Sequence, residues 1–157
     1  MNSLTGFGAF STRLRDWIRL SVRSGGGLPG PEQFDSLARE LFALQHRANG
    51  PYRRLCDSRG VSPERLRHWS EIPAVPTAAF KELELSCLAP EARTAVFHSS
   101  GTTEQRPSRH FHNAASLALY AASLLPWFRQ HLLPEYGLAT SGNADFPRLV
   151  ILTPAPR

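Results

Sequence analysis

One short segment constrains the fold of this chain more than any other. It is rich in hydroxyl groups and lies between two short extended runs, residues 94–97 and 109–112. The segment is Ser99-Ser100-Gly101-Thr102-Thr103-Glu104-Gln105-Arg106-Pro107-Ser108. The β-branched and apolar residues of the first run predict a buried strand, and the second run predicts another short strand. A loop between them offers backbone N–H groups, hydroxyls and guanidinium charge to a small anion such as a polyphosphate.

Two common types of site do not fit this loop. A Walker A loop needs a second glycine and a lysine before Ser or Thr, where this chain has Arg106, Pro107 and Ser108. A serine hydrolase needs a Gly-x-Ser-x-Gly elbow, which neither Ser99 nor Ser100 has, and no partner base can be assigned. A polar hairpin loop without a ligand stays open as an alternative.

The loop resembles the phosphate-binding loop of adenylate-forming enzymes. Together with two further segments, it is similar to the acyl-protein synthetase (LuxE-type) family. The matching segments are Ser99-Ser100-Gly101-Thr102-Thr103, Pro107-Ser108-Arg109-His110, and Ile72-Pro73-Ala74-Val75-Pro76 with Phe80-Lys81. The resemblance covers residues 31–157 and corresponds to the front part of the family's large N-terminal domain. It implies an α/β fold with a helical first half, followed by a sheet and a long helix.

The resemblance also implies an activity. Such an enzyme activates a fatty or other carboxylic acid with ATP and Mg²⁺ to an acyl-adenylate, then passes the acyl group to a protein thiol. An acyl-acceptor or reductase protein is the implied partner. The implied site holds the β- and γ-phosphates with a group of loop residues, and Arg106 or Arg109 screens the charge. His98 lies beside the loop, where it either hydrogen-bonds the substrate carboxylate or a phosphate or is a structural histidine. The implied phosphate-binding residues are Ser99, Ser100, Gly101, Thr102, Thr103, Arg106 and Arg109.

No catalytic residue can be assigned from the resemblance. The adenine pocket, the catalytic lysine and the acyl-accepting cysteine of the family belong to parts that follow this segment, and Lys81, Cys56 and Cys87 do not match them. The chain ends soon after a predicted buried strand at residues 148–152. We therefore expect an N-terminal fragment of a longer domain, in which residues 31–157 are the partial synthetase domain.

One departure from the family supports an alternative function. The family has glycine after the two threonines, where this chain has Glu104. Glycine permits a close approach of the backbone to phosphate, whereas glutamate adds bulk and negative charge. The alternative is a non-catalytic remnant or interaction module that retains the fold.

Composition narrows the partners. The net charge is +5, but all 18 basic residues except Lys81 are arginines, and they are spread along the chain instead of forming a patch. No aromatic and basic stacking motif accompanies them, so nucleic acid is not predicted as a partner. Cys56 and Cys87 form no metal-binding pattern. Because no signal peptide or membrane-spanning run is evident, we expect a cytoplasmic protein without an integral membrane segment.

Periodicity predicts a mainly helical first half. A basic amphipathic helix at residues 12–23 and the Gly-rich linker after it make up an N-terminal region, 1–30. That helix either docks on the protein or lies on an anionic membrane. Further helices are predicted at 31–48 and at 52–58. Another begins at Ser62, with Val61 and Leu66 as a hydrophobic staple, and a short one lies at 78–82 with Thr77 as cap. A long helix with Asn113 as cap runs to about Leu132 and is kinked at Pro126.

Two histidines stand out in the second extended run. His110 and His112 are two residues apart, so they share one face of a strand. They would begin a metal site only with a third ligand, and none is evident in the sequence. We therefore predict no metal site.

Overall fold

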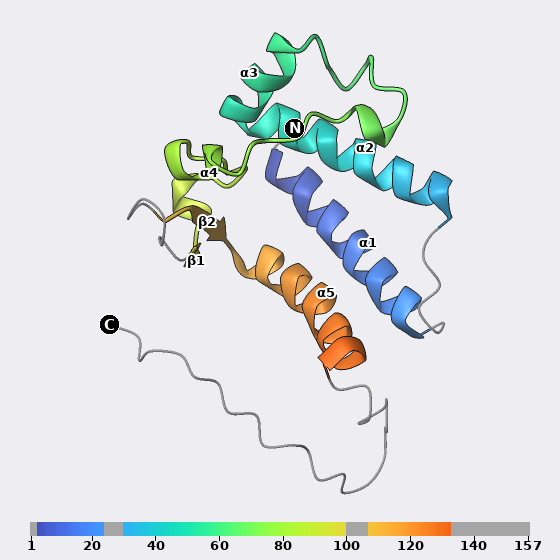
Figure 1. The fold of residues 1–157 in the computed structure, drawn as a ribbon. Helices are drawn as coiled ribbons and strands as arrows, with labels where there is room; N and C mark the ends of the chain where they lie inside the picture. Colours follow the sequence, from blue (N-terminus) through green and yellow to red (C-terminus); the bar gives the residue numbers. More distant parts are fainter. Residues whose placement is uncertain (1–2, 24–29, 100–106, 133–157) are drawn as a thin grey trace, which may run out of the picture. The chain divides into compact units, whose positions relative to one another are not determined.

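The computed structural model describes residues 3–23, 30–99 and 107–132. These residues form a mixed α/β structure that is mostly helical, with one two-stranded antiparallel sheet (Figure 1). The chain divides into two units, Met1–Ser123 and Leu124–Arg157. The main elements are α1 (Ser3–Arg23), α2 (Pro31–Ala48), α3 (Gly50–Ser58), α4 (Ala79–Glu82), β1 (Ala95–His98), β2 (Arg109–His112) and α5 (Ala114–Leu132). Two short 3₁₀ turns lie at Trp69–Glu71 and Pro90–Ala92.

The boundaries of α2 and α3 follow from local chemistry. Pro31 lies in the first turn of α2, where its missing N–H costs nothing. Asn49 ends α2 and begins α3, because its side-chain Oδ1 accepts a hydrogen bond of 3.1 Å from the Tyr52 N–H. Just after α3, Gly60 adopts a φ of +67°, a conformation that favours glycine. The predicted helices at 31–48 and 52–58 are confirmed, and α3 starts two residues earlier than predicted.

The hydrophobic core lies between these helices and the chain that follows them. Its buried members are Phe42, Tyr52, Cys56 and Leu66. The Tyr52 hydroxyl donates a hydrogen bond of 3.0 Å to the backbone oxygen of Pro73, which holds the extended connector at residues 72–76 against the core. Burial raises the pKa of the Tyr52 hydroxyl, so this group stays protonated and donates.

The first helix is longer than the sequence predicts and docks on the protein. α1 starts at Ser3, nine residues before the predicted start. Phe10 is buried, and Arg13 forms an ion pair with Glu40 of α2. A Cβ atom at Gly6 would lie 3.0 Å from Leu44 Cδ2, so the absence of a side chain there permits the close approach of α1 to α2. Of the two interpretations of this helix, docking is the one observed.

None of the helices in the described part of the chain has the length and apolar character needed to cross a membrane.

Two local predictions are wrong. The predicted helix from Ser62 is a single turn, in which the Arg65 and Leu66 N–H groups both donate to the Ser62 oxygen. Because Leu66 is buried in the core, the chain leaves the helical path after one turn. The N-cap residue of α4 is Ala78, whose side chain makes no capping bond, so Thr77 is not the cap.

The hairpin lies at the predicted place but is not buried. β1 and β2 pair antiparallel, with Phe97 opposite His110 and His98 opposite Arg109. The prediction of a buried strand at 94–97 is wrong, because Val96 and Phe97 are each 42% exposed. The strand predicted at 148–152, and with it a larger sheet, lies outside the described residues.

The long helix after the hairpin is confirmed. The Asn113 side chain accepts a hydrogen bond of 2.9 Å from the Ser116 N–H, so Asn113 is the N-cap of α5 as predicted. The helix contains Pro126 and ends at Leu132. Its apolar face is largely exposed: Tyr120, Leu124 and Leu125 are among the exposed large hydrophobic residues.

Candidate functional site

The base of the hydroxyl-rich loop is closed by two hydrogen bonds. The Ser99 N–H donates to the Ser108 oxygen at 3.3 Å, and the Ser108 N–H donates to Ser99 Oγ at 3.0 Å. Ser99 and Arg109 are therefore held at the same end of the hairpin. The other predicted phosphate-binding residues lie outside the described residues; they are Ser100, Gly101, Thr102, Thr103 and Arg106.

The serine just before β2 and a histidine on β2 continue this hydrogen-bonded series. Ser108 is buried, and its hydroxyl oxygen lies 2.9 Å from His110 Nε2. The His110 ring packs on Phe80, with ring centroids 5.4 Å apart. Sequence analysis did not predict the Ser108–His110 pair. The sequence spacing could have indicated this pair, because residues two apart in an extended chain lie on the same face.

The two faces of the hairpin carry different chemistry. Phe97, His110 and His112 share one face, on which the Phe97 and His112 rings lie 4.6 Å apart. His98, Arg109 and Phe111 share the opposite face, as alternation along each strand requires. His98 and Arg109 are both exposed, so the predicted charge-screening arginine and the predicted substrate-proximal histidine lie side by side on adjacent strands.

Arginine surrounds the aromatic ring on the second face. The Arg93 guanidinium lies 4.2 Å from the Phe111 ring centroid, and that of Arg109 lies 5.7 Å from it. Arg93 also forms a hydrogen-bonded ion pair with Glu84. The hydrogen bond from Arg93 holds the pKa of the Glu84 carboxyl below its usual value. Because Glu84 engages Arg93, Arg109 is the better placed of the two arginines to meet an anion on the loop.

An apolar pocket lies against the first face of the hairpin. Its volume is about 710 Å³, within the size range of ligand-binding pockets. Its walls come from α1, α2, residues 85–88, the hairpin and the first half of α5. Cys87 lies in this wall, and burial raises the pKa of its thiol to about 11.

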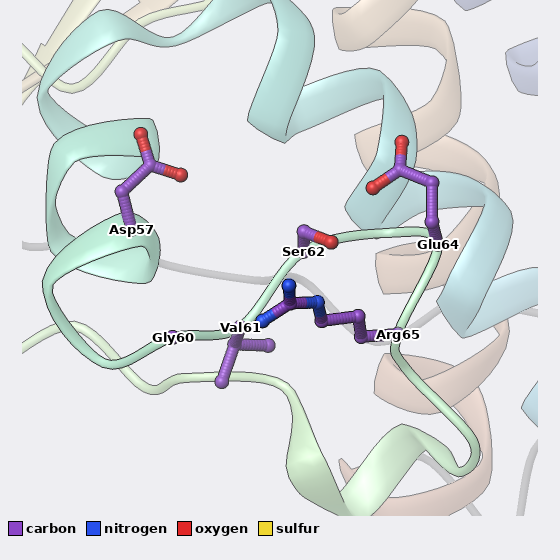
Figure 2. Close-up of a pocket in the computed structure, with 6 residues that line it drawn as sticks. All are labelled: Asp57, Gly60, Val61, Ser62, Glu64 and Arg65. Atoms are coloured by element: carbon purple, nitrogen blue, oxygen red, sulfur yellow. The ribbon is translucent and has the colours of Figure 1, made fainter.

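A second hollow, of about 400 Å³, lies where α3 passes into the following turn (Figure 2). Figure 2 shows the carboxylates of Asp57 and Glu64 on opposite sides of it, with the Arg65 side chain between them. Asp57 Oδ1 lies 3.3 Å from His46 Nε2, and a hydrogen bond with Ser62 lowers the pKa of Glu64. Because charges of both signs line this hollow, it favours no particular charged ligand.

Within residues 3–23, 30–99 and 107–132, no three side chains of His, Cys, Asp or Glu gather as a metal site requires. The structure does bring together Ser99, Ser108, His110 and Arg109 at the loop base, beside the apolar pocket. In comparisons with known proteins, no family model, no curated protein and no solved structure matched this chain.

Proposed function

We propose that this chain is, or forms part of, an adenylate-forming acyl-protein synthetase. In this reaction, ATP activates a fatty or other carboxylic acid to an acyl-adenylate, and the acyl group passes to a protein thiol. The proposal rests on the resemblance of three segments to the LuxE-type family. The structural observation that supports it most is the closed loop base, where Ser99 and Ser108 are hydrogen-bonded to each other beside Arg109.

The groups at the loop base fit a phosphate. Ser99 Oγ accepts a hydrogen bond from the Ser108 N–H, so its own hydroxyl proton stays available for an anionic oxygen. Arg109 is exposed and starts β2 directly after the loop, where its guanidinium suits a bidentate contact with phosphate. Bound Mg²⁺ would neutralise phosphate charge, and the loop hydroxyls and amides would orient the triphosphate.

Neither cysteine of the described residues suits the role of acyl acceptor. Cys56 is fully buried in the core. The Cys87 thiol has a pKa of about 11 because of its burial, so very little thiolate is present near neutral pH. The acceptor thiol of the proposed reaction therefore belongs elsewhere, which agrees with the absence of the family's cysteine motif around both residues.

Acid-dependent ATP–pyrophosphate exchange tests the proposal. We expect exchange with the wild-type chain, and a loss of about 10- to 150-fold for each charge-assisted hydrogen bond removed in Thr102→Ala with Thr103→Ala. Ser123→Ala is the matched control, because Ser123 is an exposed serine on α5, away from the loop. Exchange that is unchanged in the threonine variant would show that the loop is not the phosphate site.

A non-catalytic interaction module is the second candidate. Two observations favour it: the exposed apolar residues Val96 and Phe97 of β1, and Glu104 in the position of the family glycine. A glutamate about 6 Å from a phosphate charge costs on the order of 3 kcal/mol at an effective dielectric constant near 20. If the wild type neither exchanges pyrophosphate nor binds Mg-ATP in calorimetry, but Glu104→Gly binds Mg-ATP, the chain is a remnant that lost the activity.

A further inference from the structure

The apolar pocket beside the hairpin contains surface that the described residues leave uncovered. Phe97 is 42% exposed and Tyr120 is 48% exposed, although their rings lie 5.9 Å apart and both line the pocket. Leu85, Leu88 and Leu119 add aliphatic surface to the same walls. Burying this surface against an apolar ligand would be favourable, in proportion to the area removed from water.

Polar side chains line the pocket from several elements, and two of them are the histidines of β2. His110 and His112 both line it, and each uses one ring nitrogen inside the protein. His110 Nε2 pairs with Ser108 Oγ, and His112 Nδ1 lies 3.2 Å from Ser116 Oγ. Among the residues that the structure describes, His110 Nδ1 and His112 Nε2 have no hydrogen-bond partner. These two nitrogens lie on one face of the strand and suit a ligand head group with two oxygens.

The part of the pocket wall that His110 forms is linked to the hydroxyl-rich loop. His110 contacts Ser108, and the Ser108 N–H donates to Ser99 Oγ, so two hydrogen bonds connect the pocket wall with the loop base. A carboxylate bound at the histidines would therefore lie close to the groups proposed to hold ATP.

We propose that this pocket binds the apolar chain of a monocarboxylic acid, with the carboxylate at His110 and His112. The choice of a carboxylate rests on the proposed function, whereas the choice of an apolar chain rests on the pocket itself. Aromatic and leucine side chains form the apolar surface of the pocket walls. They come from α1, α2, residues 85–88, the hairpin and α5, which are far apart in sequence.

Cys87 provides a direct reporter of occupancy. It lies in the pocket wall, whereas Cys56 is fully buried in the helical core, so that reaction at Cys56 reports unfolding of the chain. We would measure carbamidomethylation of each cysteine by peptide mass spectrometry, with iodoacetamide and without ATP, in the presence of saturated acids from hexanoate to hexadecanoate. The reaction is run at pH 9, because iodoacetamide reacts with the thiolate and the raised pKa of Cys87 leaves little of it at neutral pH. We expect protection of Cys87 that strengthens about fourfold per added methylene, the ratio that corresponds to about 0.8 kcal/mol, until the chain fills the pocket.

Head-group recognition is tested with two variants. His112→Phe removes both ring nitrogens of a histidine at the pocket, and His131→Phe makes the same change at an exposed histidine outside it. We expect His112→Phe to weaken protection by dodecanoate at least tenfold and to leave protection by dodecanol unchanged. His131→Phe should match the wild type with both ligands.

Several outcomes would overturn the proposal. They are no protection at any chain length, equal protection by dodecanoate and dodecyltrimethylammonium, and an equal effect of both histidine variants. Protection that rises with protein concentration without acid, together with dimers in sedimentation, would assign the pocket to a second copy of the chain. Because the assay needs no ATP, acid binding without pyrophosphate exchange would refute the proposed function alone, and exchange without Cys87 protection would refute the pocket alone.

Discussion

The helical core and the β1–β2 hairpin use aromatic side chains in opposite ways. Phe42 is 1% exposed and meets the Tyr52 ring edge-on, with centroids 6.1 Å apart. Phe97 also contacts two rings, those of His112 and Tyr120, yet 42% of it is exposed. The core is closed by side chains from residues 42–75, whereas the hairpin retains apolar surface on which a ligand or another chain can bind.

The difference has a physical basis. A helix buries its apolar stripe against one neighbouring helix, and α2 and α3 are joined directly at Asn49. A two-stranded hairpin has two faces and two edges, and alone it is marginally stable in water. The hairpin therefore depends on what packs against it, and this dependence suits a site that binds a ligand.

The largest expected effect comes from removing matched aromatic rings from the two regions. Phe42→Ala should lower the free energy of unfolding by about 3–5 kcal/mol, since it leaves a cavity in the core. Phe97→Ala should cost less than about 1.5 kcal/mol, because much of that ring is already in contact with solvent. Urea denaturation of both variants measures the difference, and equal costs would contradict the contrast between core and hairpin.

A smaller effect is expected from the two asparagine caps. Asn49 is buried beside the core and accepts from the Tyr52 N–H, whereas Asn113 is half-buried and accepts from the Ser116 N–H. Asn49→Ala should destabilise the chain by about 1–2 kcal/mol, and Asn113→Ala by about 0.5–1 kcal/mol. Hydrogen exchange should show local opening at the start of α5 for Asn113→Ala and global loss of protection for Asn49→Ala. The reverse pattern would show that the region of α2 and α3 is less stable than the start of α5.

The smallest effect concerns the pH dependence of stability at the pocket wall. Burial raises the pKa of Cys87 from 9.0 to about 11, so the folded state favours the neutral thiol. The corresponding stabilisation is complete below about pH 9 and is lost as the pH rises towards 11. Since Cys87 is only half-buried, we expect less than about 1 kcal/mol. The free energy of unfolding is measured at pH 8 and pH 11. The loss that belongs to Cys87 should appear in the wild type and be absent in Cys87→Ser, and both proteins contain Cys56.

Much of the local structure follows from the sequence alone. Pro31, Asn49, Gly60 and Asn113 mark helix ends because their side-chain or backbone chemistry acts within a few residues. The same holds for the hairpin, whose two short extended runs flank a loop of hydroxyls and glycine. Local patterns therefore suffice to place the two strands, and the anion-binding role of the loop between them stays a prediction.

The remaining features depend on contacts between distant segments. The turn at Ser62 ends early because Leu66 enters a core built from α2, α3 and the connector at 72–76. β1 is largely exposed although three of its four residues are apolar, because burial is decided by what packs on a strand and not by its composition. The pocket required α1, α2, residues 85–88, the hairpin and α5 to come together. Local propensity carries no information on such long-range packing, so only the tertiary structure decided where the apolar pocket forms.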